Sequence, residues 1–433
     1  MRATTSRALL ALTLATGLNG AITTAFAADA PAAASAASQP ANAVRPAFAG
    51  PFSAAQELLK SGNGAGALAK LKELDAVPDQ TPYEKYLVLR VRAPAEYTIN
   101  DFNGAAADFE AILTNPLLPA EDRLLMMKSA AGIYYSSEQY PKAAQAIQRY
   151  LDAGGTDAQL KELLPQAQYA SKDYTSAAKN FRAAVDADYA AGRVPSEKLL
   201  RLEYSSYMGL KDETGVVNAM EHLAVNYPKA DYWRDLIPRV REIDNFADRL
   251  VLDYYRLKTQ VLGRVEDRER LNYVALAARA GYPGEAKKVL EEASASKPFT
   301  GTDLAEANRL RLEVNKAAAA DVAQQSSNEA SARTAKDGNA LVSQGLLEAV
   351  GDNAAKGAQL IEQGIAKGGL KLPEDAKLHL GYAQVRAGRD ADALKTFQSV
   401  TGANGQAALA HDWILYLQSK QAAAAAPAVA ASR

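Results

Sequence analysis

The chain has 433 residues, of which 48% are hydrophobic and 23% are charged, and its formal net charge is -1. These values are typical of globular proteins, and a net charge near zero gives no overall field that would favour nucleic acid or an anionic membrane. The absence of cysteine excludes disulfides, thiolate nucleophiles, zinc–thiolate sites and iron–sulfur clusters.

The N-terminus has the order of a secretory signal peptide. Arg2 and Arg7 precede an apolar run over residues 8–18, and small residues then lead to Ala25-Phe26-Ala27. An uncleaved membrane anchor is the alternative, but the apolar run is short and is broken by Gly17, Asn19 and Gly20. We therefore expect cleavage after about Ala27 and a periplasmic protein. Without a cysteine at the cleavage site, it would not be a lipoprotein.

Segments rich in alanine lie at both ends of the expected mature chain. Residues 28–50 contain little besides Ala, Pro and Ser, and residues 420–433 are mostly alanine. Such segments cannot bury a core, so we predict a disordered linker and a disordered tail. No other apolar run is long enough to span a bilayer, so we expect no integral membrane segment in the mature chain.

One sequence phrase recurs along the chain between these segments. It is clearest at Phe102, Ala105, Phe109 and Ile112, where a small anchor residue is followed by a large apolar residue four positions later. The anchors lie at 67, 105, 143, 177, 216, 286, 357 and 393, so the steps are 38, 38, 34, 39, 70, 71 and 36 residues. Each of the two long steps is about twice a period of roughly 34, and we expect each to conceal one degenerate repeat.

Residues twelve positions before each anchor strengthen the pattern. Five of these eight positions hold Ala or Gly, at Ala55, Ala93, Ala131, Gly345 and Gly381. A small residue on one helix lets its neighbour approach closely, and the large residue on the neighbour fills the remaining space. Any alanine-rich helical protein would produce some such matches, but eight near one period favour a true repeat.

These residues resemble the tetratricopeptide repeat family, a helix–turn–helix motif with small or apolar residues at set positions. The best single match is Leu380-Gly381, Gly388, Ala393 and Phe397, and Pro228 fits the terminal proline of the motif. The resemblance covers residues 51–300 and 338–419. It implies an all-α fold, a right-handed α-solenoid of stacked helix–turn–helix repeats, and a non-enzymatic adaptor role.

Two segments depart from the regular repeat. Residues 231–263 are more aromatic, and we predict that they form the concealed helix pair of the first long step, with Trp233 in a packing role. Residues 301–337 lack Pro, and also Gly between Gly301 and Gly338, and become polar in their second half. We predict one long, partly exposed helix there, which is a docking element, a spacer or a solvated insertion.

A candidate binding groove follows from the register. In tetratricopeptide proteins the first helix of each repeat, helix A, lines the inner face, and two of its positions would point inward here. They carry Tyr97, Tyr135 and Tyr169 at one position, and Arg90, Lys128, Glu162 and Arg201 at the other. Aromatic faces with cationic donors would suit an extended peptide with acidic groups or a C-terminal carboxylate. Alternatively, the tyrosines pack between adjacent helices.

The sequence offers no motif for catalysis. The glycine-rich segment 62–66 lacks the Lys-Ser/Thr of a phosphate loop, and the three histidines, His222, His379 and His411, have no partner at metal-ligand or triad spacing. We expect no metal, no cofactor and no enzymatic activity. The favoured function is a periplasmic scaffold that binds protein or peptide partners. The alternative is a module that binds peptidoglycan or an exported polysaccharide.

Overall fold

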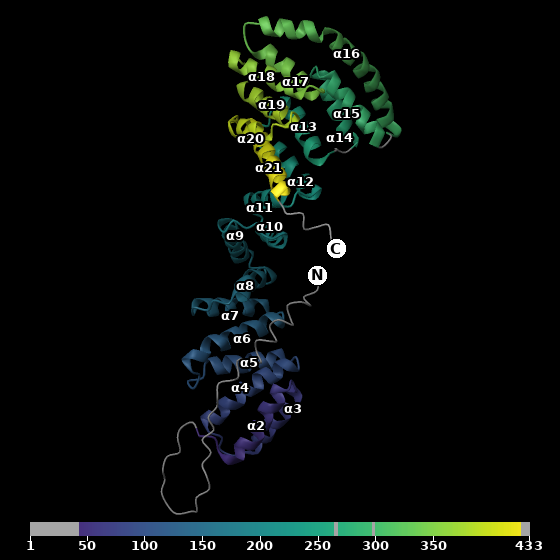
Figure 1. Cartoon of the computed structure of the whole chain (residues 1–433). Coiled ribbons are helices and arrows are strands. Elements are labelled where there is room, and N and C mark those ends of the chain that lie inside the picture. The colour runs from purple at the N-terminus through teal and green to yellow at the C-terminus, as the bar shows by residue number, and fades with distance from the viewer. Residues whose placement is uncertain (1–42, 264–266, 297–298, 426–433) are drawn as a thin grey trace, which may run out of the picture. The chain divides into compact units, whose positions relative to one another are not determined.

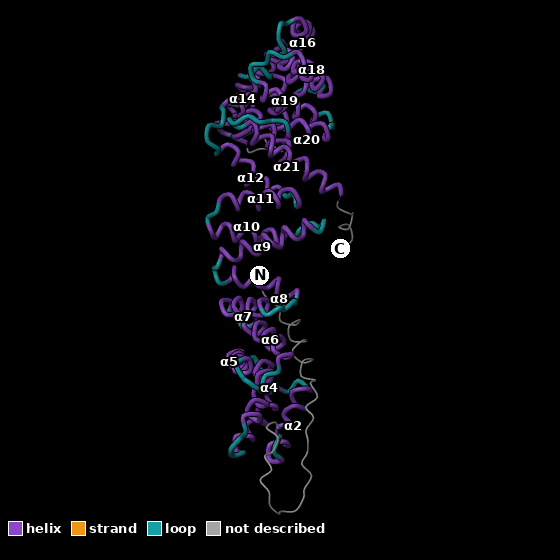
Figure 2. Tube along the Cα trace, turned by 90° about the vertical axis from the view of Figure 1, so that its left-hand side faces the viewer, coloured by secondary structure: helices purple, strands orange, loops and turns teal. Residues whose placement is uncertain are grey.

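A computed structural model of the chain describes residues 43–263, 267–296 and 299–425, and within these ranges the regular elements are helices, joined by loops and turns (Figure 2). The all-α prediction is therefore confirmed, and neighbouring helices pack in adjacent pairs. The chain divides into two compact units. Unit 1 runs to Pro195 and also includes Leu202–Asp212, and unit 2 comprises Ser196–Arg201 and everything from Glu213 onward.

Unit 1 is a succession of helical hairpins (Figure 1). Its helices are α2 (Pro46–Lys60), α3 (Gly64–Glu73), α4 (Pro82–Thr98), α5 (Phe102–Leu113), α6 (Arg123–Ser136), α7 (Tyr140–Asp152), α8 (Ala158–Ala170), α9 (Tyr174–Ala190) and most of α10 (Glu197–Leu210). We call the even-numbered helices of unit 1 its A helices and the odd-numbered ones its B helices.

The same tight turn joins the two helices of each hairpin in unit 1. Between α4 and α5, Asn100 has a left-handed φ of 63°, and the Asp101 amide donates to the Glu96 carbonyl over 2.9 Å. The Asp101 side chain then accepts from the Gly104 amide over 3.0 Å and caps α5. Left-handed residues occupy the equivalent turn positions at Gly62, Glu138 and Lys172. The turn satisfies the last carbonyls of one helix and the first amides of the next.

The anchor residues lie on helices α3, α5, α7 and α9 of unit 1 and on α11 (Glu213–Asn226), α15 (Pro283–Ser296), α18 (Ala354–Lys367) and α20 (Asp390–Gln398) of unit 2. All eight are buried, at positions 67, 105, 143, 177, 216, 286, 357 and 393. The close contact between neighbouring helices is clearest at Gly381, where an added Cβ would come within 2.5 Å of the Phe397 ring. Likewise, a Cβ on Gly345 would come within 2.7 Å of the Gly357 carbonyl oxygen. Small residues are therefore required at these crossings by packing.

Unit 2 contains hairpins arranged around a central helix (Figure 1). Its helices are α11 (Glu213–Asn226), α12 (Ala230–Leu236), α13 (Val251–Leu262), α14 (Asp267–Arg279), α15 (Pro283–Ser296), α16 (Gly301–Thr334), α17 (Asn339–Val350), α18 (Ala354–Lys367), α19 (Pro373–Arg386), α20 (Asp390–Gln398) and α21 (Gln406–Ala425). The last helix, α21, packs against α11, α13, α19 and α20.

The central helix is α13, which is enclosed on all sides. Residues 252–258 are all buried, including three charged residues. Arg256 donates to Asp253 over 2.8 Å and to both carboxylate oxygens of Glu285 on α15 over 2.9 and 2.8 Å. Its guanidinium also lies 5.0 Å from the Tyr282 ring centroid and 5.7 Å from that of Tyr382. A buried charge needs ion pairs and hydrogen bonds to all of its polar atoms, because burying an unpaired charge would strongly destabilise the fold.

The first long step between anchors contains a helix pair, because α12 and α13 contact each other. The pair is irregular, since α12 has only 7 residues and passes into a 3-10 helix over Ile237–Arg241. The second long step conceals no helix pair, so the prediction is wrong there. Helix α16 is a single helix of 34 residues, and much of its second half is exposed. Buried residues recur every three or four positions from Ala307 to Ala318, so the first half of α16 packs through one narrow seam, and the next buried residue is Ala332.

The predicted boundaries at the chain ends also need correction. Helix α2 begins at Pro46, inside the expected linker 28–50, because Phe48 and Phe52 pack together with ring centroids 5.3 Å apart. Helix α21 extends to Ala425, inside the expected tail 420–433. The predicted signal peptide and the rest of the linker and tail lie outside the described residues. Within the described part of the chain, no helix combines the length and apolar character needed to cross a membrane.

Candidate binding surfaces

The structure separates the seven predicted groove residues into two sets. Six lie on A helices of unit 1, with Arg90 and Tyr97 on α4, Lys128 and Tyr135 on α6, and Glu162 and Tyr169 on α8. Arg201 belongs to the part of α10 that clusters with unit 2. Glu162 is exposed, and its side chain accepts from Gln166 over 3.5 Å.

The two basic residues of this set are paired with carboxylates. The Arg90 guanidinium lies 2.9 Å from Asp122, and the Lys128 ammonium lies 2.6 Å from Asp157. Both aspartates stand at the N-terminus of the following A helix, so each pair links one repeat to the next. These cations are therefore already neutralised, and they are less suited to an acidic ligand than the sequence suggested.

The three tyrosines form a repeated aromatic pair. Each packs edge-to-face against the first residue of the next B helix, in the pairs Tyr97–Phe102, Tyr135–Tyr140 and Tyr169–Tyr174, with ring centroids 5.6, 5.7 and 5.6 Å apart. All six rings are half-buried. The rings thus serve packing within the hairpin and also present part of their surface at the same point of three successive repeats.

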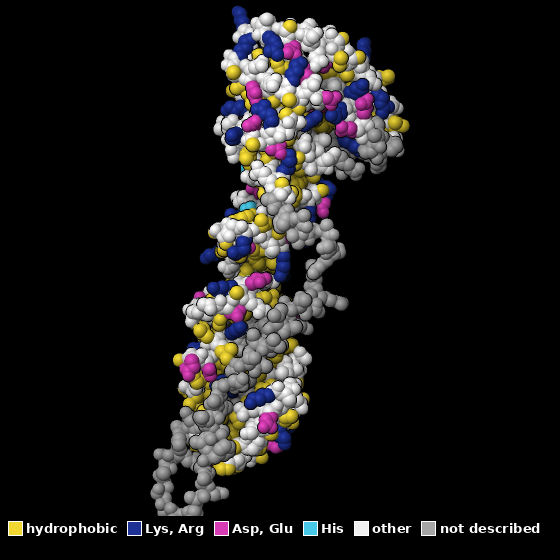
Figure 3. All heavy atoms as spheres, viewed as in Figure 1, with side chains coloured by type: hydrophobic (Ala, Val, Ile, Leu, Met, Phe, Trp, Pro, Cys, Tyr) yellow, Lys and Arg dark blue, Asp and Glu magenta, His cyan; other side chains and the backbone are white. Residues whose placement is uncertain are grey.

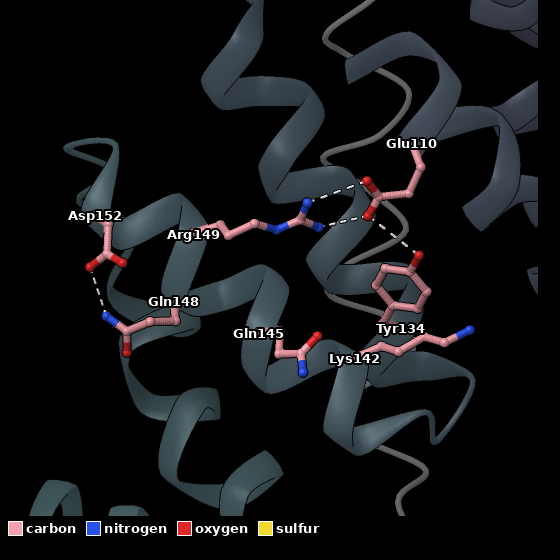
Figure 4. Close-up of a pocket in the computed structure, with 7 residues that line it drawn as sticks. All are labelled: Glu110, Tyr134, Lys142, Gln145, Gln148, Arg149 and Asp152. Carbon is pink, nitrogen blue, oxygen red and sulfur yellow. Dashed lines mark hydrogen bonds and ion pairs between the residues drawn. The ribbon is translucent and has the colours of Figure 1, made fainter. Parts of the chain in front are cut away.

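A pocket lined by polar and charged residues, which the sequence did not reveal, lies over α5, α6 and α7 (Figure 4). Its volume is about 600 Å³, and it is lined by Glu110, Tyr134, Lys142, Gln145, Gln148, Arg149 and Asp152. Glu110 and Arg149 are 39 positions apart, and only the stacking of adjacent B helices brings them together. No motif within one repeat could have indicated this juxtaposition.

Charges in this pocket are balanced by pairing. Arg149 donates to both carboxylate oxygens of Glu110 over 2.6 and 3.3 Å, and the Tyr134 hydroxyl donates to Glu110 over 3.4 Å. Burial, followed by the Glu110 charge, raises the pKa of Tyr134, so its phenol stays protonated. The Lys142 ammonium lies 5.5 Å from the Tyr134 ring centroid. Amides, a phenol and a compensated ion pair suit a neutral ligand rich in hydroxyl groups.

Two of the three histidines lie beside carboxylates within unit 2. His379 Nε2 is 3.3 Å from Asp253, and His411 Nε2 is 3.0 Å from Glu221. Within the described residues, neither pair is joined by a hydrogen bond to a serine or other nucleophile at triad geometry. Across the described ranges, no group of three His, Asp or Glu side chains is arranged to hold a metal ion.

Comparison of the chain with models of known protein families and with curated proteins finds no match. On the face of unit 2 seen in Figure 3, basic and acidic side chains are intermixed rather than gathered by sign.

Proposed function

We propose that this protein is a non-catalytic scaffold of the bacterial envelope, a right-handed tetratricopeptide-like solenoid that binds a peptide segment of a partner protein along the A helices of unit 1. The observation that carries the proposal is the aromatic pair repeated at Tyr97, Tyr135 and Tyr169. Half-exposed rings at a fixed position in successive repeats give a peptide regularly spaced contact area at low entropic cost.

Unit 2 is a weaker candidate for this role. Its interior is already occupied by α13, whose charges are saturated by Glu285 on α15 and by His379 on α19. The A helices of unit 1 hold no such central helix among the described residues of that unit. Because Arg90 and Lys128 are paired, we propose that recognition relies on the rings and on backbone hydrogen bonds of the bound segment.

Crosslinking in intact cells followed by fractionation tests this proposal. We expect the mature chain in the periplasmic fraction and a defined protein captured through unit 1. Retention of the chain in the cytoplasm would contradict the proposed periplasmic localisation. Failure to capture any protein would contradict the scaffold role. Fusion of residues 1–27 to a periplasmic reporter tests the signal peptide separately.

A second candidate function is binding of a cell-wall glycan, and the pocket over α5, α6 and α7 favours it. Side chains such as Gln145, Gln148 and the Glu110–Arg149 pair are the groups that commonly hydrogen-bond to sugar hydroxyls. Sedimentation with purified sacculi separates the two candidates. If the pocket binds glycan, Glu110→Gln together with Gln145→Ala should abolish co-sedimentation, whereas Lys179→Ala on the exposed surface of α9 should not.

A further inference from the structure

The C-terminal helix α21 closes unit 2 by packing on α11. His411 of α21 and Glu221 of α11 are 190 positions apart, and their side chains meet at 3.0 Å. Leu409, Trp413 and Leu417 of α21 are at most 1% exposed. Trp413 stacks on Phe397 of α20 with ring centroids 5.6 Å apart and planes inclined by 3°. Helix α21 is therefore a fully integrated element whose register is fixed by apolar packing.

One side chain in this interface does not fit apolar packing. Asp412 is 7% exposed, and its Oδ2 atom has no hydrogen-bond partner. A buried carboxylate without a partner is very costly, whereas a buried neutral carboxylic acid is tolerated much more readily. Four other buried carboxylates of unit 2, Asp253, Glu285, Glu348 and Asp375, each pair with a cation and show what the fold supplies where a charge is retained.

We infer that α21 is a pH-responsive latch, docked on α11 while Asp412 is protonated and His411 is charged, and released from it as the pH rises. The inference is independent of the proposed peptide site, because all of its groups lie in unit 2.

The charges around Asp412 act on its pKa in opposite directions, because His411 lowers it and Glu221 raises it, and burial outweighs both. The charged and titratable groups that face it are Glu221 of α11, His411 of its own helix and the Tyr254 phenol of α13. Helices α19 and α20 meet α21 through the rings of Tyr382 and Phe397 on Trp413, and through the Asp390–Lys420 ion pair further along. Arg241 of the 3-10 helix lies over the Tyr254 ring, 5.3 Å from its centroid.

The sign of the pH effect follows from the two titrations. Burial raises the pKa of Asp412 from 3.8 to about 8, with a further contribution from Glu221. The hydrogen bond to Glu221 raises the pKa of His411 above 6.5. Both pKa values are raised by docking, so each contribution is complete below the ordinary pKa and is lost as the pH rises through the raised one. For Asp412 this window runs from about 4 to about 8.

Release would uncover the surfaces that α21 now hides. These are the apolar side of α11 and one side of α13, where Gln260 donates to the Tyr416 hydroxyl over 3.1 Å. Seven consecutive buried residues make α13 a helix that depends on its neighbours for shielding. A modest rise in pH would thus convert a closed unit 2 into one with exposed apolar helix faces.

Distance measurement between spin labels on α11 and α21 tests the latch in the full chain. Because the chain has no cysteine, Asn218→Cys and Gln418→Cys place one label on an exposed position of each helix. We expect a single short distance at pH 5.5 and a second, longer population at pH 8.5. One coupled proton changes the ratio of open to docked molecules by up to about tenfold per pH unit, so this ratio should grow by up to roughly 300-fold between pH 5.5 and pH 8.

Matched variants identify which side chain causes the pH response of this distance. Asp412→Asn should keep the short distance at both pH values, and Asp412→Leu provides the same test if the amide packs poorly. His411→Gln should reduce the pH response without removing it, and Glu291→Gln, which changes an exposed carboxylate on α15, should leave it unchanged. A single distance at both pH values in the unmodified sequence would overturn the inference. A persistent pH response in both Asp412 variants would do so as well.

Discussion

The Asp157 carboxylate joins two successive repeats, because it accepts from the Lys128 ammonium over 2.6 Å and from the Leu160 amide over 2.9 Å. The first bond comes from α6 and the second caps α8. One side chain therefore ends a loop, begins a helix and fixes the position of that helix against its neighbour. Although burial alone would raise the pKa of Asp157, the Lys128 and Leu160 hydrogen bonds lower it overall.

The two roles of Asp157 can be separated by substitution. Asp157→Ala removes both the cap and the ion pair and should lower the free energy of unfolding by about 1–2 kcal/mol. Asp157→Asn keeps a capping oxygen and should lower the free energy of unfolding by only about a few tenths of a kcal/mol. Urea unfolding of both variants measures the difference. Equal losses would show that the ion pair, and not the cap, is what stabilises this junction.

At the helix crossing of Gly381, substitution by alanine should destabilise the protein, although helix propensity alone would favour alanine. Gly381→Ala places a Cβ within 2.5 Å of the Phe397 ring and should destabilise the protein by about 1–3 kcal/mol. Gly284→Ala in α15, where an added Cβ meets nothing within 4 Å, should stabilise it by about 0.5–1 kcal/mol. Thermal unfolding distinguishes them, and stabilisation by both would contradict the close crossing.

A pH dependence of unit 1 is expected from Glu96. Burial, then the charge of Asp108, raises the pKa of Glu96 from 4.5 to about 7, and its Oε2 has no hydrogen-bond partner. Because the pKa is raised in the folded state, stability is complete below about 4.5 and is lost as the pH rises toward 7. Glu96→Gln should flatten this slope when unfolding is measured between pH 5 and 8. An unchanged slope would contradict the assignment.

Arg256 is the cation on which the interior of unit 2 depends. Arg256→Met would leave the carboxylates of Asp253 and Glu285 without their guanidinium partner and should cost about 3–5 kcal/mol. Arg256→Met combined with Glu285→Gln should recover part of that loss. Denaturant unfolding of the single and double variants measures the coupling, and additive losses would show that the pair does not act as a unit.

Acid should loosen the same interior. Burial alone would raise the pKa of Asp253, but His379 and Arg256 outweigh it and lower the value to about 2. A lowered pKa gives stability that is present above about pH 4 and lost as the pH falls toward 2. Asp253→Asn should remove this acid dependence when unfolding is followed between pH 2 and 5. The opposite slope would contradict the pairing.

The repeat, and with it the hairpin architecture, could be predicted because packing imposes it locally. Ala105 and Phe109 lie one helical turn apart, so their relation is visible in the sequence. The tyrosines could be placed on A helices for the same reason. Their edge-to-face partners, such as Phe102, lie five positions on across the turn and were equally open to prediction.

The central position of α13 could not be predicted from the repeat. Its charges pair with Glu285, His379 and other residues far along the chain, and such pairing leaves no periodic trace. The concealed helix pair of the second long step failed for a related reason. A doubled period counts residues but says nothing about whether they form two helices, as expected, or one helix like α16.

The central claim, peptide binding along the A helices of unit 1, is tested most directly by photo-crosslinking in cells. A photoreactive amino acid would replace Tyr97, Tyr135 or Tyr169 in turn, with Lys179 on α9 as the control position. We predict that all three ring positions capture the same protein and that position 179 does not. Capture of unrelated proteins at the three positions, or equal capture at position 179, would contradict the account.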